Sequence, residues 1–171
     1  LMQSIIKLPQ PVIAQIHGTA AAAGCQLVAT CDLAIASTTA KFATPGVNIG
    51  LFCSTPMVAV SRKLPRKKMM EMLLMGDLVS AETALEFGLI NRVVAYEKLE
   101  ETVSNYANKI KEKSPLVLKI GKEAFYNQID MPLAEAYKYT AEVMTQNMLA
   151  QDANEGINAF IEKRQPTWAG K

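Results

Sequence analysis

The chain has 171 residues, of which 50% are hydrophobic, 20% are charged and 6% are aromatic. A chain of this length can bury a sizeable core in one domain, and its composition excludes an intrinsically disordered protein. The 18 Lys and Arg residues against 16 Asp and Glu residues leave a net charge of only +2. A dedicated nucleic-acid-binding domain is therefore not expected, because such domains carry a basic excess.

Three cysteines occur at spacings that fit neither a disulfide framework nor a zinc site: Cys25, Cys31 and Cys53. We expect them to be reduced, which indicates an intracellular compartment. The most apolar stretch, residues 20–36, is interrupted by Gln26 and Asp32, so no membrane span is expected. Residues 1–8 resemble the last turns of a helix rather than a cleavable signal, and we expect an upstream segment to be missing from the chain.

The first quarter of the chain alternates helix and strand. Pro9 and Pro11 end the opening helix, since proline cannot continue it. Small residues and good helix formers predict a helix that begins within or just after residues 20–29. Short apolar runs predict strands at residues 12–17, 33–36 and 41–43. The order strand, helix, strand predicts an α/β unit with a parallel sheet.

The middle of the chain carries helix boundaries. Thr55 and Pro56 predict a helix start, with the threonine as cap and the proline in the first turn. The Met-rich segment 66–75 is predicted to be a helix that ends at Gly76.

After residue 76 the predicted structure changes from mixed helix and strand to mostly helix. Ser80 is expected to cap a helix that ends before Gly88, and residues 91–95 predict one more strand. In the last third, apolar residues recur at helical spacing and leave a charged opposite face. The change near Ser114 predicts a boundary between an α/β core, residues 1–113, and a helical region, residues 114–171.

The small-residue turn after Gly18 is a candidate site. A strand that runs through such a turn into a helix presents backbone N–H groups at the helix N-terminus, where they can hold negative charge on an oxygen. Only alanines occupy positions 20–23, so a ligand can approach the backbone closely. Tight packing of the helix on the sheet is the alternative explanation.

A series of motifs runs along the whole chain: His-Gly-Thr-Ala-Ala-Ala-Ala-Gly-Cys-Gln-Leu (17–27), Cys-Asp-Leu-Ala-Ile-Ala (31–36), Phe-Ala-Thr-Pro-Gly-Val-Asn-Ile-Gly-Leu (42–51), Gly-Asp-Leu-Val-Ser-Ala-Glu-Thr-Ala (76–84), Phe-Gly-Leu-Ile-Asn-Arg-Val-Val (87–94) and Glu-Gly-Ile-Asn-Ala-Phe-Ile-Glu-Lys-Arg (155–164). In this order they resemble the enoyl-CoA hydratase/isomerase (crotonase) family. The resemblance implies an α/β fold, a crotonase-like ββα spiral of which the chain holds the C-terminal two-thirds, followed by a helical oligomerisation region.

The resemblance also implies a chemistry. Members of the family stabilise a thioester enolate with two backbone N–H groups, of which one corresponds to the N–H of Ala23 and the other would come from the upstream segment. The substrate would be an acyl-CoA or enoyl-CoA thioester, with CoA as part of the substrate and no separate cofactor or metal. The resemblance implies further substrate contacts for Ala21, Gly24 and Ser54. It also implies that Met144 forms a wall of the pantetheine or acyl pocket, and that Lys163 contacts a CoA phosphate of a neighbouring subunit.

Two positions depart from the family pattern. Family hydratases have glutamates where this chain has Gln26 and Gly46. One carboxylate activates water while the other supplies a proton, and each such role is worth about 10²–10⁴ in rate. Gln26 can orient water or substrate but cannot ionise, and Gly46 has no side chain, so rapid hydration is not expected.

Three functions follow from these observations. The first is an enoyl-CoA hydratase-like enzyme of fatty-acid metabolism, and the second is a non-catalytic acyl-CoA-binding or assembly subunit. We expect a homotrimer or a hexamer, without a nucleic-acid or membrane partner, in the cytoplasm of a bacterium or the mitochondrial matrix of a eukaryote. RNA binding is a third hypothesis, and it would use a basic cluster that otherwise forms a solvated face: Arg62, Lys63, Arg66, Lys67 and Lys68.

For His17 and Cys25, a structural histidine and an inert buried thiol are expected rather than catalytic groups.

Overall fold

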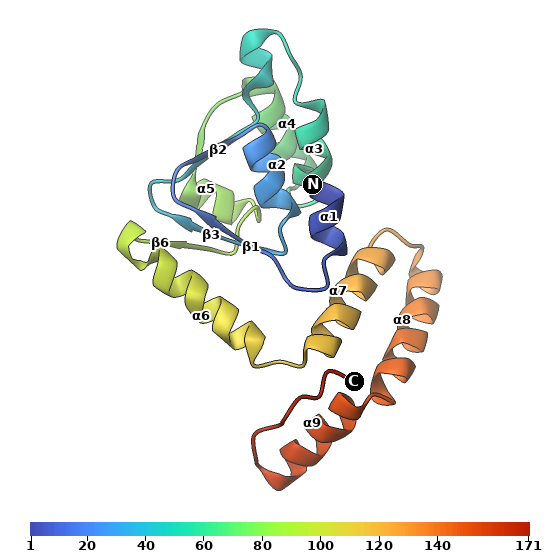
Figure 1. Cartoon of the computed structure of the whole chain (residues 1–171). Coiled ribbons are helices and arrows are strands. Elements are labelled where there is room, and N and C mark those ends of the chain that lie inside the picture. Colours follow the sequence, from blue (N-terminus) through green and yellow to red (C-terminus); the bar gives the residue numbers. More distant parts are fainter. The chain divides into compact units, whose positions relative to one another are not determined.

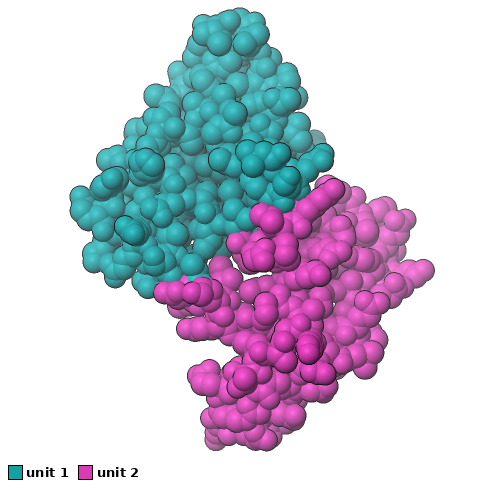
Figure 2. Space-filling model, in the orientation of Figure 1, with its two compact units in different colours: residues 1–5, 12–107 teal, residues 6–11, 108–171 magenta.

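The computed structural model describes all 171 residues as two compact units (Figure 2). Unit 1 contains residues 1–5 and 12–107, and unit 2 contains residues 6–11 and 108–171. Unit 1 holds every strand, and unit 2 is helical apart from its connecting segments (Figure 1). The oligomerisation role expected for residues 114–171 stays a prediction.

Two small sheets form the centre of unit 1. The first has the order β1 (Ile13–Ile16), β3 (Leu33–Ser37), β6 (Arg92–Val94), and both of its pairs are parallel. The second has the order β2 (Thr19–Ala21), β4 (Lys41–Ala43), β5 (Val79–Ser80), in which β2 and β4 are parallel and β4 and β5 are antiparallel. The predicted parallel sheet is therefore confirmed, whereas β2 and β5 were not predicted.

Five helices that belong wholly or partly to unit 1 come before residue 96: α1 (Met2–Lys7), α2 (Ala23–Thr30), α3 (Ser54–Val60), α4 (Arg66–Met75) and α5 (Ala81–Glu86). A 3₁₀ helix, η1 (Pro45–Ile49), follows β4. Helix α2 packs against α3, and buried side chains from α2, β4 and α4 share one core that includes Cys25, Phe42 and Met72. This packing fixes the start of α2 against the end of β4.

The predicted boundaries of α4 and α5 are confirmed. Gly76 ends α4 in the left-handed conformation with a φ of 66°, which glycine adopts without strain. The hydroxyl of Ser80 accepts a hydrogen bond from the backbone N–H of Thr83 and caps α5. Gly88, with a φ of 84°, lies just beyond the end of α5.

The prediction that Thr55 caps α3 was wrong, because the helix begins one residue earlier. The backbone N–H of Ser54 donates to the carbonyl of Phe52 over 2.7 Å, so the chain has already turned before Thr55. The carbonyl of Cys53 accepts the first helical bond, from the N–H of Met57. Cys53 is therefore the cap residue, and it makes no side-chain capping bond.

The last third of the chain is helical, as its periodicity predicted. After a short 3₁₀ helix, η2 (Tyr96–Lys98), the elements are α6 (Leu99–Lys111), α7 (Pro115–Gln128), α8 (Leu133–Met148) and α9 (Gln151–Glu162). Ser114 caps α7 by accepting from the N–H of Val117 over 3.1 Å. None of the helices combines the length and apolar character that a bilayer-crossing helix needs.

Candidate active site

The small-residue turn joins β2 to α2 through Ala22. The N–H of Ala22 donates to the carbonyl of Ala43 over 3.0 Å, which anchors the turn to the end of β4. The carbonyl of Ala22 accepts the first helical bond, from the N–H of Gln26 over 3.0 Å. The N–H of Ala23 precedes this ladder, and no acceptor for it is present in the chain. Because Ala23 is exposed, its donor is available to a ligand.

Ala22 has an unusual backbone conformation. Its φ of 48° and ψ of −112° lie in a region that glycine occupies easily and alanine does not. Such a conformation costs about 1–3 kcal/mol and persists only where neighbouring structure imposes it. Here the pairing of Ala21 with Ala43 holds one side of the turn and α2 holds the other. These two neighbours therefore fix the peptide plane that carries the Ala23 donor.

Gln26 lies three residues after Ala23, on the same side of α2. It is half-buried, and its carbonyl accepts from the hydroxyl of Thr30 over 2.7 Å. Its carboxamide can donate and accept hydrogen bonds beside the turn, but it cannot take up or release a proton at neutral pH. The structure thus brings together the predicted residues Ala21, Ala23, Gly24 and Gln26.

Gly46 lies in a closed loop. The carbonyl of Gly46 accepts from the N–H of Leu51 over 2.9 Å, and the N–H of Gly46 contacts the Cys53 sulfur at 3.3 Å. A Cβ added at Gly46 would lie 2.8 Å from the Leu51 carbonyl oxygen and 3.0 Å from the Cys53 sulfur. Glycine is therefore required here by space, and position 46 cannot carry a carboxylate while the loop keeps this shape.

Cys25 and Cys53 are both buried beside this loop. Burial raises the pKa of the Cys25 thiol to about 12, and the nearby thiol of Cys53 adds to the increase. Cys25 is thus un-ionised at neutral pH, in agreement with the expected inert thiol. His17 is exposed, and its carbonyl accepts from the hydroxyl of Ser37 over 3.5 Å.

The remaining predicted residues lie apart from the turn in the sequence. Ser54 begins α3, and its hydroxyl donates to the carbonyl of Phe52 over 3.3 Å. Met144 is 60% exposed on α8. Lys163 ends α9 with an exposed side chain and a positive φ of 54°. Met144 and Lys163 belong to unit 2, whereas the turn, Gly46 and Ser54 belong to unit 1.

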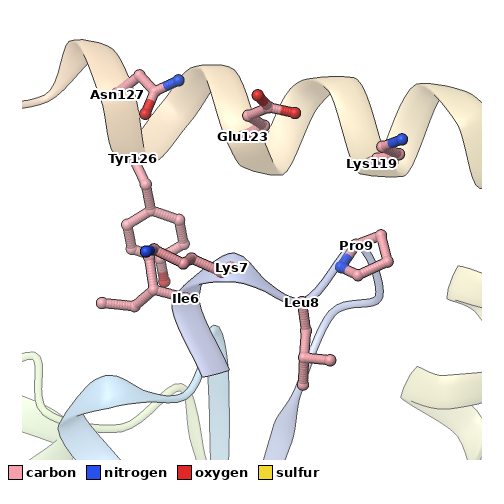
Figure 3. A pocket seen from close by; sticks show the side chains of 8 residues that line it. All are labelled: Ile6, Lys7, Leu8, Pro9, Lys119, Glu123, Tyr126 and Asn127. Atoms are coloured by element: carbon pink, nitrogen blue, oxygen red, sulfur yellow. The ribbon is translucent and has the colours of Figure 1, made fainter. Parts of the chain in front are cut away.

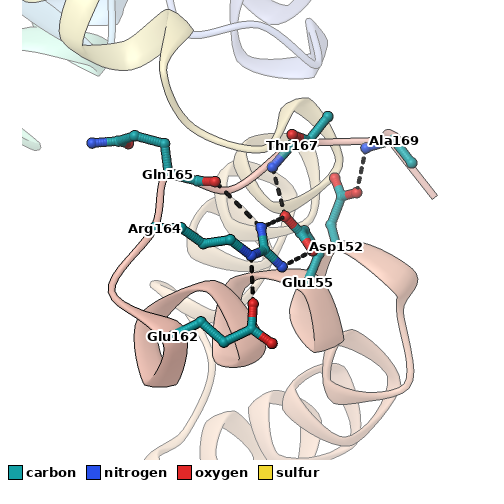
Figure 4. A network of polar contacts seen from close by, with 7 residues as sticks. All are labelled: Asp152, Glu155, Glu162, Arg164, Gln165, Thr167 and Ala169. Carbon is teal, nitrogen blue, oxygen red and sulfur yellow. Dashed lines mark hydrogen bonds and ion pairs between the residues drawn. The ribbon is translucent and has the colours of Figure 1, made fainter.

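A network of charged groups holds the C-terminal segment on α9 (Figure 4). Arg164 forms a two-pronged ion pair with Glu155, at 2.6 and 2.9 Å, and also pairs with Glu162 at 2.6 Å. Asp152 is buried and accepts from the hydroxyl of Ser114 and from the N–H groups of Ala169 and Gly170. Those bonds, the one from Ser114 above all, hold the pKa of Asp152 below its usual value. The motif identified Glu155 and Arg164, but nothing in the sequence pointed to the Asp152 contacts.

A cavity of about 540 Å³ in unit 2 lies between residues 6–9 and α7 (Figure 3). Lys119 and Glu123 line it from α7, and Tyr126 points towards Lys7. Most of its lining residues are exposed, and none is a predicted site residue. The candidate site is therefore the turn at Ala23.

Comparisons with known proteins agree with the motifs. The enoyl-CoA hydratase/isomerase family profile matches residues 1–171. Enoyl-CoA hydratase domain-containing protein 3 of Xenopus laevis, named as mitochondrial, is 51% identical over 168 residues, which cover 98% of this chain and 57% of that protein. The chain thus spans little more than half the length of this relative.

Two crystal structures are similar to the chain over 98% of its length. One is an enoyl-CoA hydratase of Mycobacterium smegmatis, with a TM-score of 0.96, 49% identity and 65% of that chain covered. The other is human enoyl-CoA hydratase domain-containing protein 3, with a TM-score of 0.96, 49% identity and 66% covered. The mixed α/β fold expected from the resemblance is therefore confirmed at the level of the family.

Proposed function

Because the chain belongs to the enoyl-CoA hydratase/isomerase family, we propose that it binds an acyl-CoA or enoyl-CoA thioester with the thioester oxygen at the N–H of Ala23. The strained conformation of Ala22 is the observation that carries this proposal. A donor fixed before the ligand arrives stabilises the negative charge of an enolate oxygen without reorganisation. Ala21 and Gly24 contribute a wall without bulky side chains, and Gln26 orients water or substrate.

The proposed site lacks the proton-transfer groups of a hydratase. Hydration needs one group that removes a proton from water and another that delivers a proton to the α-carbon. Gln26 fills neither role, and the closed loop at Gly46 leaves no room for a second carboxylate. We therefore propose that enolate stabilisation is retained while rapid hydration is lost, in a member of a family associated with fatty-acid metabolism.

The second candidate is a non-catalytic acyl-CoA-binding or assembly subunit. The closure of the loop around Gly46 favours it, since the missing carboxylate cannot be replaced by a small movement of a side chain. The two candidates predict the same thioester complex. They differ in turnover alone.

Assembly into a trimer or a hexamer is also proposed, with the helices after residue 113 as the contact region. Helices α8 and α9 expose large apolar side chains that a monomer leaves in water: Leu133, Tyr137, Met144, Met148, Ile157, Phe160 and Ile161. In such an assembly Met144 would line the acyl or pantetheine pocket, and Lys163 would reach a CoA phosphate of a neighbouring subunit. We also propose that the core is part of a ββα spiral.

Localisation is proposed from the relatives. One similar protein is named as mitochondrial and another comes from a bacterium, at nearly equal identity. A eukaryotic source would therefore place the chain in the mitochondrial matrix, and a bacterial source would place it in the cytoplasm.

Calorimetry with acetoacetyl-CoA tests the proposed donor directly. Proline lacks an N–H and is tolerated at the first helical position, so Ala23→Pro removes the donor and keeps the helix. The tested protein is the double variant Ala22→Gly with Ala23→Pro, because glycine permits the turn before a proline. The single variant Ala22→Gly is the matched control. We expect the double variant to bind about 10–100-fold more weakly than Ala22→Gly, as for a lost bond to a charged group.

Equal affinities of these two variants would refute the role of Ala23. Hydration of crotonyl-CoA, followed by the loss of its conjugated absorbance, separates the two candidate functions. Slow turnover that needs the Ala23 donor supports the enzyme. Binding without turnover supports the subunit, and turnover at the rate of a hydratase contradicts the interpretation of Gln26 and Gly46.

A further inference from the structure

Cations gather where α3 is followed by α4 in unit 1. Helices α3 and α4 contact each other (Figure 1). Lys68 has partners within the chain, because it pairs with Glu71 at 3.5 Å and lies 4.8 Å from the centre of the Phe87 ring. The other four cations are exposed and form no ion pair, and we call them the basic surface: Arg62, Lys63, Arg66 and Lys67.

Two members of the basic surface, Arg66 and Lys67, stand in the first turn of α4. Positive charge is unfavourable there, because the N-terminal N–H groups of a helix already carry partial positive charge. Helix α4 has no acidic residue in its first turn and no side-chain cap, so nothing in the helix offsets this repulsion. An arrangement that breaks a local rule without an internal gain is typical of a functional surface. Its charge calls for an anionic partner.

The exposed face of α4 changes from cationic to apolar along the helix. Met70 is 46% exposed and Leu74 is 58% exposed. They follow Arg66 by four and eight residues, so the three side chains share one side of the helix. The core packs against other residues of α4: Met69, Met72 and Leu73. Cations beside large exposed apolar side chains are typical of a helix that lies on an anionic bilayer.

RNA, the other anionic partner considered for these residues, explains less of the surface. Proteins that bind single strands without sequence preference stack the bases on aromatic side chains. The basic surface includes no aromatic residue, and the nearby Phe87 is buried beside Lys68. Phosphate contacts would also leave Met70 and Leu74 in water. A lipid surface accommodates both the cations and the apolar side chains.

We propose that residues 62–74 bind the surface of a membrane that contains anionic lipids. The basic surface contacts the headgroups, and Met70 and Leu74 enter the boundary between headgroups and acyl chains. The sequence led us to expect no membrane partner because it contains no spanning segment, but binding at the surface needs none. The proposal goes beyond thioester binding and uses none of the residues proposed for the thioester site or for assembly.

Co-sedimentation of the full 171-residue chain with vesicles tests the proposal. The vesicles are phosphatidylcholine alone or phosphatidylcholine with about one-third phosphatidylserine. We expect binding to the anionic vesicles only, and weaker binding as salt is added. Arg66→Gln with Lys67→Gln should weaken binding about 25-fold, since each cation near an anionic surface contributes about fivefold. This variant should also have a higher midpoint of thermal unfolding, because two cations leave the N-terminus of α4.

The matched control is Lys109→Gln with Lys111→Gln. It removes the same charge from two exposed residues in the last turn of α6, and it should bind the vesicles as the wild type does. Met70→Gln with Leu74→Gln leaves the charge unchanged. It should weaken binding about tenfold, because less apolar surface enters the bilayer.

Four outcomes would overturn the inference. The first is no binding of the wild type to anionic vesicles, and the second is equal weakening in the two charge variants, which would indicate attraction by net charge alone. The third is unchanged binding of the Met70 and Leu74 variant. The fourth is tighter binding to polyuridylic acid than to the vesicles, which would favour a nucleic-acid partner. None of them bears on the proposed function, which acetoacetyl-CoA tests separately.

Discussion

Gly46→Ala is predicted to destabilise the fold although the backbone at Gly46 suits alanine. The new Cβ would lie 2.8 Å from the Leu51 carbonyl oxygen, which is backbone and cannot rotate away. Overpacking of this kind costs about 1–3 kcal/mol in the free energy of unfolding. Urea denaturation measures the change. Gly121→Ala is the control, because its Cβ would meet nothing within 4 Å in α7 and should stabilise the chain by about 1 kcal/mol.

The same contact decides whether hydration can be rebuilt. If position 46 has no room, Gln26→Glu with Gly46→Glu will not raise the rate of crotonyl-CoA hydration above that of Gln26→Glu alone. Two outcomes would refute this reasoning: a Gly46→Ala variant as stable as the wild type, or a gain of tenfold or more in the double variant. Either would mean that residues 46–53 move at little cost.

Three other predictions concern strain and the C-terminal segment. Ala22→Gly should raise the urea midpoint by relieving the positive φ, and Ala22→Val should lower it because a β-branched residue fits there worse. The hydrogen bonds from Arg164 lower the pKa of Glu155 from 4.5 to about 2. The ionised Glu155 carboxylate therefore contributes its full stabilisation above pH 4.5 and loses it as the pH falls through 2. In Glu155→Gln, the change that acid causes in the fluorescence emission of Trp168 should be smaller. Asp152→Ala should move that emission to longer wavelength at neutral pH, by releasing the N–H partners of the segment.

Much of the fold could be predicted from local chemistry. Proline, glycine and serine at Pro9, Gly76 and Ser80 act through their own backbone or hydroxyl group, so their effect can be recognised without knowing the tertiary structure. The strand β2 could not, because its four-alanine context favours a helix and only pairing with β4 makes residues 19–21 extended. The prediction that Thr55 caps a helix was wrong for a related reason. The turn closed by the Ser54 N–H and the Phe52 carbonyl starts the helix one residue earlier.

The residues of the candidate site were named from the sequence and their roles stay predictions, whereas the geometry of the turn could not be predicted. Ala23 and Gln26 follow from the family motif, whereas nothing distinguishes Ala22 from the alanines on either side of it in the sequence. The reason for glycine at position 46 could not be inferred from the sequence either. It depends on the carbonyl of Leu51 and the sulfur of Cys53, which approach only when the loop closes.

The two strained positions connect these results. Ala22 and Lys163 are the non-glycine residues with positive φ in the structure, and each adjoins or forms a proposed ligand contact: Ala22 sets the Ala23 donor, and Lys163 presents a cation. Strain of this kind lowers stability, so packing alone gives no reason to keep it. The loop is closed around Gly46, so no side chain fits at this position while the loop keeps its shape. Under the proposed function, a turn strained beside the Ala23 donor and a loop closed around Gly46 would together favour thioester binding over hydration.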